Sequence, residues 1–305
     1  MTFDYPPGFK PLTGVYEPSA IVQLADGRFL VVEDEKDHPF TLLRLDLAGG
    51  VEAQPLRPGG FAADADFWKL DDLEGLAVDT AGFIHAVTSH SRTGSGKEKR
   101  SRDKLVRFRV EEDRVVDPAV ALGLKPLLVA SHPALAEAMA RLDVKGEGGL
   151  NIEALEFEPV TQALLVGLRS PLLEGRALLA RIARPAALFE AGQPECRLIV
   201  LALAGHGMRA LAHVPDLGGY LIVSGPVGRA PEPFRVWRWS GRDDAAPSPL
   251  WPPDGTDWAH AEGLCPARLA GESVLVVVSD DGDRAQGRPA GFRILRPDQL
   301  VPGAL

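Results

Sequence analysis

The sequence predicts an all-β fold, and two observations support this. A short phrase recurs five times along the 305 residues, and each copy opens an apolar run that leads through a turn into a second, more hydrophobic run. The phrases begin at residues 17, 74, 153, 209 and 262, so successive copies lie 53 to 57 residues apart, except for one gap of 79. A fixed period of this kind indicates supersecondary units that pack against one another.

Each unit contains up to four short runs that are rich in apolar, β-branched or aromatic residues and bounded by Gly, Pro or Asp, as strands are. The expected strands are 20–24, 29–32, 41–47 and 51–56; 76–78, 83–88, 105–110 and 114–120; 154–157, 163–168, 177–182 and 196–201; 210–214, 220–224, 234–239 and 250–251; and 264–266, 273–278 and 292–295. Four strands per unit, repeated around an axis, are typical of a β-propeller. We therefore predict a single domain over residues 1–305 with five blades; the alternative is six.

Two features of the spacing refine this prediction. The residues after Glu262, together with residues 1–17, amount to about one more period, so we expect the N-terminal residues to supply the fourth strand of the fifth blade and to close the ring. The long gap contains residues 125–148, where 133–142 reads as a short helix that glycines follow. This segment is expected to be a helical insertion.

The composition excludes several classes of function. The chain is 45% hydrophobic and 25% charged, with a formal net charge of −9, which disfavours nucleic-acid binding because that needs a basic surface. No apolar run is long enough to span a membrane, and the N-terminus lacks the features of a secretory signal. Cys196 and Cys265 are the two cysteines, which fits a reduced, cytoplasmic setting.

The repeated phrase also places candidate site residues. If each phrase begins the innermost strand of a blade, then Glu17, Glu74, Glu153, Arg209 and Glu262 converge on one rim of a central channel. Asn151 and Asp280 are expected beside them. Carboxylate and amide oxygens suit Ca²⁺ or Mg²⁺, so these six acidic and amide side chains are candidate ligands of a divalent cation. The alternative is structural: the glutamates would hydrogen-bond the backbone of the next blade.

Histidines and basic residues on the same rim are candidates for catalysis and substrate binding. His206 and His260 precede predicted innermost strands, His90 follows the second strand of its unit, and all three are candidate general acids or bases. Arg92, Arg169, Arg209 and Lys97 are candidate ligands of a small anionic substrate. Arg92 and Lys97 belong to residues 89–104, the one basic stretch of this acidic chain. The alternative for each is a solvated loop or an ordinary hydrogen bond.

Several motifs resemble a known family. The patterns Asp72–Asp79, Asn151–Leu155 and Ser279–Gly282 resemble an uncharacterised bacterial β-propeller family, a domain of unknown function. More distantly, the chain is similar to esterase-like phytase, SdiA-regulated and gluconolactonase-type propellers. These relatives imply a calcium-type ion at the channel and, in some cases, hydrolysis of esters or phosphate esters. The shared Glu-Gly-Leu phrase carries this implication to Glu74, Glu153 and Glu262, whereas Arg209 departs from it.

The leading hypothesis from the sequence is a metal-dependent hydrolase of a small ester, lactone or phosphate ester. The first alternative is a non-enzymatic propeller that binds a ligand or protein on the same rim, for which Trp68 and Trp258 should be exposed beside the channel. The second is a structural scaffold in which the glutamates only connect the blades.

Overall fold

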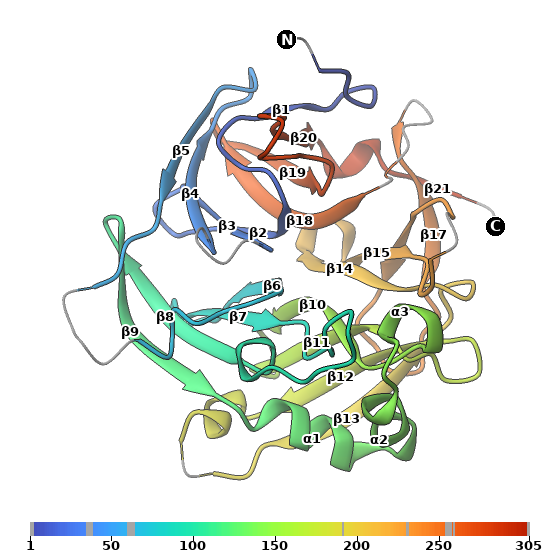
Figure 1. Cartoon of the computed structure of the whole chain (residues 1–305). Coiled ribbons are helices and arrows are strands. Elements are labelled where there is room, and N and C mark those ends of the chain that lie inside the picture. The colour runs from blue at the N-terminus through green and yellow to red at the C-terminus, as the bar shows by residue number, and fades with distance from the viewer. Residues whose placement is uncertain are drawn as a thin grey trace.

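The computed structural model describes residues 3–34, 39–59, 65–190, 192–229, 232–253, 258 and 260–303. In this part of the chain, five antiparallel sheets surround a central axis, as Figure 1 shows. Each sheet consists mainly of consecutive strands, so the chain completes one blade before it begins the next. The predicted five-bladed β-propeller is therefore confirmed.

In blades 1 to 4 the innermost strand comes first in sequence, and in blade 5 it is the first strand after blade 4. Blade 1 consists of β2 (Pro18–Gln23), β3 (Phe29–Glu33), β4 (Phe40–Leu45) and β5 (Val51–Pro55). Blade 2 consists of β6 (Leu73–Val78), β7 (Ile84–Thr88), β8 (Leu105–Glu111) and β9 (Arg114–Ala121). Blade 3 consists of β10 (Asn151–Glu158), β11 (Ala163–Ser170), β12 (Ala177–Ala183) and β13 (Glu195–Leu201). The first four strands of blade 4 are β14 (Gly207–Val214), β15 (Gly219–Gly225), β16 (Arg235–Trp239) and β17 (Ser248–Trp251). The three inner strands of blade 5 are β18 (Ala261–Leu269), β19 (Glu272–Ser279) and β20 (Ala290–Leu295).

Both end regions of the described chain add a strand to a blade. The strand β1 (Lys10–Leu12) pairs antiparallel with β20 and completes blade 5, which confirms the predicted closure by the N-terminal residues. The strand β21 (Val301–Pro302) pairs with β17 and gives blade 4 a fifth strand, which the sequence did not predict. Two residues, one of them a proline, carry no alternating pattern from which a strand could be recognised.

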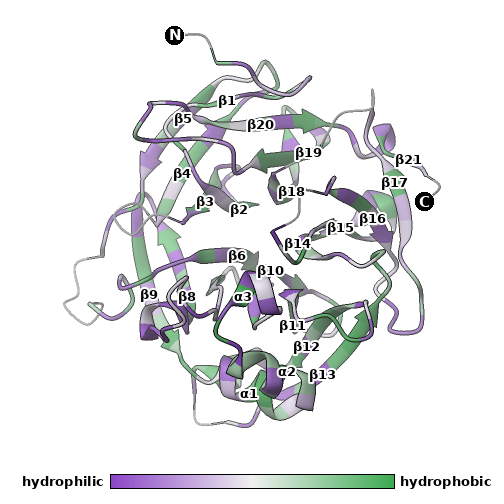
Figure 2. Ribbon diagram, turned by 45° about the vertical axis from the view of Figure 1, so that its right-hand side comes forward, coloured by the Kyte–Doolittle hydropathy of each residue, from purple (hydrophilic) through white to green (hydrophobic). Residues whose placement is uncertain are grey.

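The hydrophobic core lies between the blades. Five separate clusters of buried side chains fill the five interfaces between neighbouring blades, and Figure 2 shows hydrophobic stretches on strands such as β12 and β19. A four-stranded sheet that is apolar on both faces cannot bury them alone, so each blade depends on its two neighbours. This packing fixes the five inner strands around the axis.

The inner strands approach one another closely, which explains the small residue in each repeated phrase. The strand register places the small residues at one equivalent position, and these are Ala20, Gly75, Ala154, Ala210 and Gly263. A Cβ atom on Gly75 would lie 2.7 Å from the Cβ of Leu155 in blade 3, and one on Gly263 would lie 3.2 Å from the Cα of Ala20 in blade 1. The phrase Glu-Gly-Leu therefore combines a site residue with a packing requirement.

The predicted helical insertion is also confirmed. It consists of α1 (Leu124–Ser131), α2 (Pro133–Ala140) and α3 (Val144–Glu147), between blades 2 and 3. The 3₁₀ helices are η2 (Arg100–Arg102), η3 (Pro185–Leu188), η4 (Pro215–Leu217) and η6 (Pro297–Gln299). The helices α1 and α2 lie at the edge of the ring beside β13, and α3 lies nearer the axis (Figure 1). Among the described residues, none of the helices has the length and apolar character of a membrane span.

Candidate functional site

A cavity of about 1100 Å³ lies on one rim of the propeller, at its centre. All five inner strands and the helical insertion contribute to its lining, and most of the lining residues are polar or charged. Its lining residues include Ser19, Asp34, Asp72, Glu74, Ser91, Arg92, Arg102, Lys145, Asn151, Glu153, Arg169, Arg209, Arg229, Glu232, Phe234, His260, Glu262 and Asp280. Most of the side chains predicted to converge on one rim therefore do so.

A β-bulge in each inner strand turns one side chain toward the axis. The register between the first two strands of every blade shifts at the same point, and the residues skipped there are Ser19, Glu74, Glu153, Arg209 and Glu262. A bulge re-aims the side chain that it carries, which accounts for four charged groups at the centre of a strand ring. We refer to these five side chains as the bulge ring.

The bulge ring corrects one predicted position. In the alignment of the repeated phrases, Glu17 was equivalent to Glu74, but the strand register makes Ser19 the equivalent residue. Glu17 instead corresponds to Asp72, two residues earlier, and it is not part of the described lining of the cavity. Glu17 precedes the bulge of its strand by two residues, whereas Glu74 is the bulged residue itself. Matching the two glutamates by residue type therefore shifted the alignment by two positions. Glu17 acts on the cavity through its charge, which raises the pKa of Asp280.

Arg209 connects two glutamates of the bulge ring. Its Nη1 lies 3.0 Å from Oε2 of Glu153 and 2.9 Å from Oε1 of Glu262, and its Nη2 donates a hydrogen bond to the carbonyl oxygen of Pro226 at 3.1 Å. The guanidinium also lies 5.0 Å from the centroid of the Phe234 ring. Burial opposes the charge of Arg209, but the neighbouring glutamates raise its pKa above the ordinary value. Arg209, which stands where the other phrases have glutamate, is thus a buried counter-ion for two of those glutamates.

Glu153 has further partners on blade 3. Its Oε1 accepts hydrogen bonds from Nη1 of Arg169 at 2.9 Å and from Nδ2 of Asn151 at 2.7 Å. Arg169 reaches the axis because β11 carries a bulge of its own, since Asn151 pairs with Ser170 and Ile152 with Leu168. The Nε of Arg169 also donates to the carbonyl oxygen of Pro226, at 3.2 Å. Both oxygens of Glu153 are therefore engaged by cationic or amide groups.

Glu74 stands apart from this network. No described residue donates a hydrogen bond to its carboxyl group or pairs with it, although the residue is only partly exposed. Burial, followed by the charges of Glu153, Asp72 and Glu262, raises the pKa of Glu74 well above its ordinary value of 4.5. Burial and the charge of Glu153 also raise the pKa of Glu262, to about 8, although Arg209 opposes this. Glu74 differs from Glu262 in its contacts, because Glu262 is paired with Arg209 and no described residue pairs with Glu74. A proton on Glu74 makes the group neutral.

Two further acidic residues in the lining follow the second strands of blades 1 and 5. Asp34 follows β3 and Asp280 follows β19, and both line the cavity. Burial and the charge of Asp72 raise the pKa of Asp34 to about 7, although its outer edge is exposed. Burial and the charge of Glu17 raise the pKa of Asp280 to about 6, against the opposing charge of His260.

The structure separates the three predicted histidines. His260 lines the cavity, its φ of 64° is in the left-handed region, and its carbonyl oxygen accepts a hydrogen bond from the backbone N–H of Asp280 at 2.8 Å. His206 is buried behind the wall, where Nε2 lies 3.0 Å from Oε2 of Glu232, which lines the cavity. His90 is buried away from this lining beside Asp103 and Lys125, and burial lowers its pKa to about 3. The geometry favours His260 for a role in the cavity.

The basic stretch is anchored rather than free in solution. Arg92 lines the cavity, and it donates to the carbonyl oxygens of Met139 and Gly96 at 3.1 Å each and pairs with Glu98 at 3.0 Å. Lys97 is exposed and lies outside the described lining, and its backbone N–H donates to Oγ1 of Thr93 at 3.2 Å. Arg92 is therefore placed at the site, whereas Lys97 is not.

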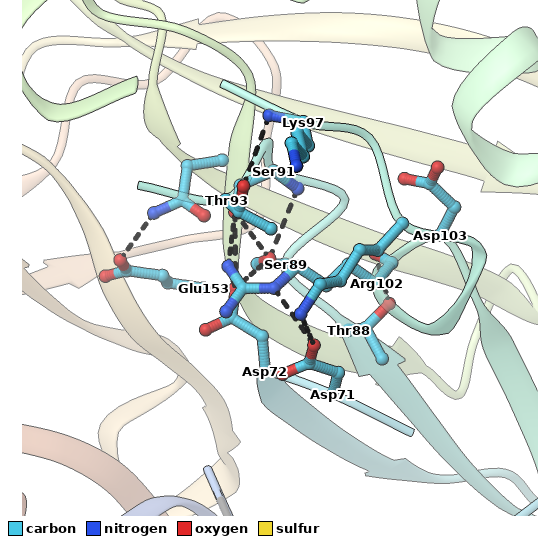
Figure 3. A network of polar contacts seen from close by, with 12 residues as sticks. Asp71, Asp72, Thr88, Ser89, Ser91, Thr93, Lys97, Arg102, Asp103 and Glu153 are labelled. Carbon is cyan, nitrogen blue, oxygen red and sulfur yellow. Dashed lines mark hydrogen bonds and ion pairs between the residues drawn. The ribbon is translucent and has the colours of Figure 1, made fainter. Parts of the chain in front are cut away.

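Arg102, which sequence reasoning missed, ties this stretch to the cavity wall. Its Nη1 donates to Oδ2 of Asp72 at 2.8 Å, and its Nε lies 3.5 Å from Oδ2 of Asp71, as Figure 3 shows. Ser89 and Ser91 also donate to Oδ2 of Asp72. Asp72 has a φ of 67°, so the backbone is held in an uncommon conformation where this network forms.

The predicted cation ligands do not fit a metal site in this arrangement. Glu153 and Glu262 are paired with arginine, and the amide of Asn151 donates to Glu153. Among the described residues, no group of three or more His, Cys, Asp or Glu side chains is arranged to hold a metal ion. Arg169 and Arg209 supply the positive charge that a cation would bring to the bulge ring.

Lys145, Arg229 and Phe234 are further lining residues that were not predicted. Lys145 lies in the helical insertion, which sequence reasoning treated only as an interruption of the repeat. A signal was nevertheless present, because the insertion directly precedes Asn151 and the residues before each inner strand were expected on the functional rim.

The middle and C-terminal parts of the chain match a family model. Residues 124–291, more than half of the chain, match the family described as "Protein of unknown function (DUF3616)". The protein belongs to this family. The DUF3616 match begins at α1 and reaches β20, so it includes the insertion, Asn151, Glu153, Arg209 and Glu262. No curated protein matches the sequence.

Solved structures similar to this DUF3616 protein include proteins of different kinds. The PQQ-bound aldose sugar dehydrogenase of Streptomyces coelicolor is 16% identical, with a TM-score of 0.44 over 95% of this chain and 100% of that chain. The gluconolactonase of Xanthomonas campestris is 12% identical, with a TM-score of 0.40 over 96% and 81%. The Malassezia sympodialis allergen Mala s 1 is 14% identical, with a TM-score of 0.43 over 92% and 77%. These values carry no argument about activity.

Proposed function

We propose that this protein hydrolyses a small ester, lactone or phosphate ester in the central cavity, with Glu74 as the general acid. The observation that carries the proposal is the contrast within the bulge ring, where Glu153 and Glu262 are paired with arginine and Glu74 has no ion-pair partner among the described residues. A carboxyl group with a raised pKa and no ion-pair partner among the described residues keeps its proton to higher pH, as a general acid needs. A protonated Glu74 that faces an open cavity of about 1100 Å³ can donate its proton to a bound substrate.

His260 is the proposed general base. It lines the cavity, and its carbonyl oxygen accepts a hydrogen bond from the backbone N–H of Asp280, which places its ring on the rim that Glu74 shares. For an ester or lactone, His260 would take a proton from water as the water oxygen bonds to the carbonyl carbon. The carbon–oxygen bond to the leaving alcohol then breaks, and that oxygen takes the proton of Glu74. Transfer of the imidazolium proton back to Glu74 restores both groups.

Arg169 is the proposed donor to the substrate oxygen that gains charge. Its Nε and Nη1 are engaged by Pro226 and Glu153, which hold the guanidinium in place, and among the described residues nothing accepts a hydrogen bond from Nη2. A donor that is fixed before the reaction stabilises developing negative charge without reorganisation. Because Glu153 and Glu262 are already paired, no step of this scheme uses a metal ion.

Hydrolysis of a panel of chromogenic esters, lactones and phosphate esters tests the proposal. We expect Glu74→Gln to lower kcat by about 100-fold or more on the best substrate, because amides do not donate a proton as an acid does. Glu52→Gln, a matched change on the exposed strand β5, should leave kcat unchanged. Absence of turnover on every member of the panel, or full activity of Glu74→Gln, would contradict the proposal.

The alternative, a propeller that binds a ligand or protein without catalysis, is less favoured because the two tryptophans expected beside the channel are not exposed there. Trp258 is 2% exposed and packs in the core between blades 4 and 5, and Trp68 is partly buried between blades 1 and 2. Neither is among the described residues that line the cavity. Binding of panel compounds without turnover would nevertheless favour this alternative.

A further inference from the structure

We infer that the substrate carries a second, anionic group, a carboxylate or phosphate, which Lys145 of the helical insertion binds. This inference rests on the proposed function, because it assigns a substrate class to the same cavity. It begins with the pairing of the cations in the lining. Six lysine and arginine side chains belong to that lining, and five of them are paired with carboxylates of described residues.

Lys145 is the sixth. It lines the cavity and is exposed to it, and no described residue pairs with its ammonium group. The charges of the other five are partly neutralised by carboxylates of the protein, whereas the charge of Lys145 remains available to a ligand. An ammonium group is an effective partner for an anion because it carries a compact charge and three hydrogen-bond donors.

The backbone that carries Lys145 is fixed at both ends of α3. Oδ1 of Asp143 caps the first turn by accepting from the backbone N–H of Gly146 at 2.9 Å, and Gly148 ends the helix with a φ of 68°. Nη1 of Arg141 donates to the carbonyl oxygens of Glu147 and Gly148 at 2.8 and 2.9 Å. A binding group on a fixed element loses less entropy when a ligand binds.

The insertion is also tied to the wall that holds Arg169. Arg229 donates two hydrogen bonds to Asp143, with Nη2 2.9 Å from Oδ1 and Nη1 3.1 Å from Oδ2. The carbonyl oxygen of Lys145 lies near Gly228, and Pro226 of the same segment accepts hydrogen bonds from Arg169. Lys145 is therefore on the side of the cavity where the reacting oxygen is proposed to bind, while Asp34 and Asp280 follow strands of blades 1 and 5.

Two arms test this inference. In the first, kcat/KM is measured for a matched pair of aryl esters, the neutral 4-nitrophenyl butyrate and the anionic 4-nitrophenyl hemisuccinate. We expect Lys145→Ala to lower kcat/KM for the hemisuccinate at least 10-fold and to change that of the butyrate less than 2-fold. Lys145→Arg should restore part of the loss, and Lys97→Ala, an exposed lysine outside the described lining, should behave as wild type. Equal effects of Lys145→Ala on both esters would overturn the inference.

The second arm does not need turnover. Binding of inorganic phosphate and of succinate is measured by calorimetry with the wild type, Lys145→Ala and Lys97→Ala. We expect the affinity for at least one anion to fall about 10-fold in Lys145→Ala alone, and the preferred anion distinguishes a phosphate from a carboxylate substrate. If an anion binds in a way that depends on Lys145 but no substrate is hydrolysed, the proposed function is contradicted and this inference is supported. Equal binding to wild type and Lys145→Ala, or binding of neither anion, would overturn it.

Discussion

Nη1 of Arg209 lies 2.9 Å from Oε1 of Glu262, so a side chain from blade 4 is paired with one from blade 5 at the axis of the ring. The same nitrogen lies 3.0 Å from Glu153 of blade 3, and these side chains are largely buried, with 7% of Arg209 and 6% of Glu153 exposed. Three consecutive blades are thus joined by one cation. Glu74, on the inner strand of blade 2, has no ion-pair partner among the described residues.

Arg209→Gln is expected to reduce the free energy of unfolding by about 3–5 kcal/mol. The change leaves the buried Glu153 and Glu262 with one fewer counter-ion, and removal of one partner from a buried ion pair typically costs this much. Urea unfolding at pH 7 measures the effect. Arg184→Gln is the matched control, because its pair with Glu195 is exposed and should contribute little. A loss in Arg209→Gln no larger than in Arg184→Gln would show that the pairing does not hold the blades together.

Arg209→Gln should also change the response to divalent cations. In the wild type, the arginine occupies the position between the two glutamates, whereas in the variant their oxygens become available as hard ligands. We expect millimolar Ca²⁺ to raise the Tm of Arg209→Gln by several degrees more than that of the wild type, because a cation that binds only the folded state stabilises it. An equal rise in both proteins would place the cation away from Glu153 and Glu262 and would contradict this prediction.

Much of the fold could be predicted from the sequence because a propeller repeats one packing problem. Each blade needs apolar runs on both faces, so the runs recur at a nearly constant spacing, and the missing strand of blade 5 could be assigned to the N-terminal residues. The fifth strand of blade 4 could not, because Val301 and Pro302 pair with β17 without a sequence pattern of their own.

The convergence of the site residues could also be predicted, but the register at the bulge could not be read from glutamates alone. Alignment by identity matched Glu17 to Glu74. Alignment by the small residue would have been correct, because Ala20 and Gly75 occupy equivalent positions and Ser19 precedes the first as Glu74 precedes the second. Close packing between inner strands allows only a small residue at the position of Ala20 and Gly75, whereas the preceding position can be Ser, Glu or Arg. Side-chain pairing, such as that of Arg209 with two glutamates, depends on distances between blades that no local pattern records.

The proposed proton on Glu74 predicts a pH-dependent difference between the wild type and Glu74→Gln. Because the folded-state pKa of Glu74 is raised above 4.5, its contribution to stability is fully present below pH 4.5 and is lost as pH rises toward the folded-state pKa. The free energy of unfolding of the wild type should therefore fall relative to that of Glu74→Gln as pH rises from 4.5 to 9. Urea unfolding of both proteins at several pH values measures this difference.

Asp280→Asn provides a comparison with a different pH window. The pKa of Asp280 is raised from 3.8 to about 6, so the wild type should lose stability relative to this variant between about pH 4 and 6 and little above pH 7. A difference for Glu74→Gln that is constant with pH would mean that Glu74 keeps an ordinary pKa, and the proposed acid would then be ionised at neutral pH.

Gly75→Ala tests whether the small residue of the repeated phrase is required by the approach of neighbouring inner strands. The new Cβ would lie 2.7 Å from Cβ of Leu155 and 3.0 Å from its backbone nitrogen, so β6 and β10 must move apart. Overpacking of this kind typically costs about 1–3 kcal/mol, measurable by urea unfolding. Gly94→Ala is the control, because a Cβ atom on Gly94 would have no atom within 4 Å apart from its chain neighbours, and the change should be neutral or slightly stabilising. Since Glu153 directly precedes the displaced segment of β10, Gly75→Ala should also lower hydrolysis, whereas equal stability of the two variants would show that the inner strands tolerate a wider ring.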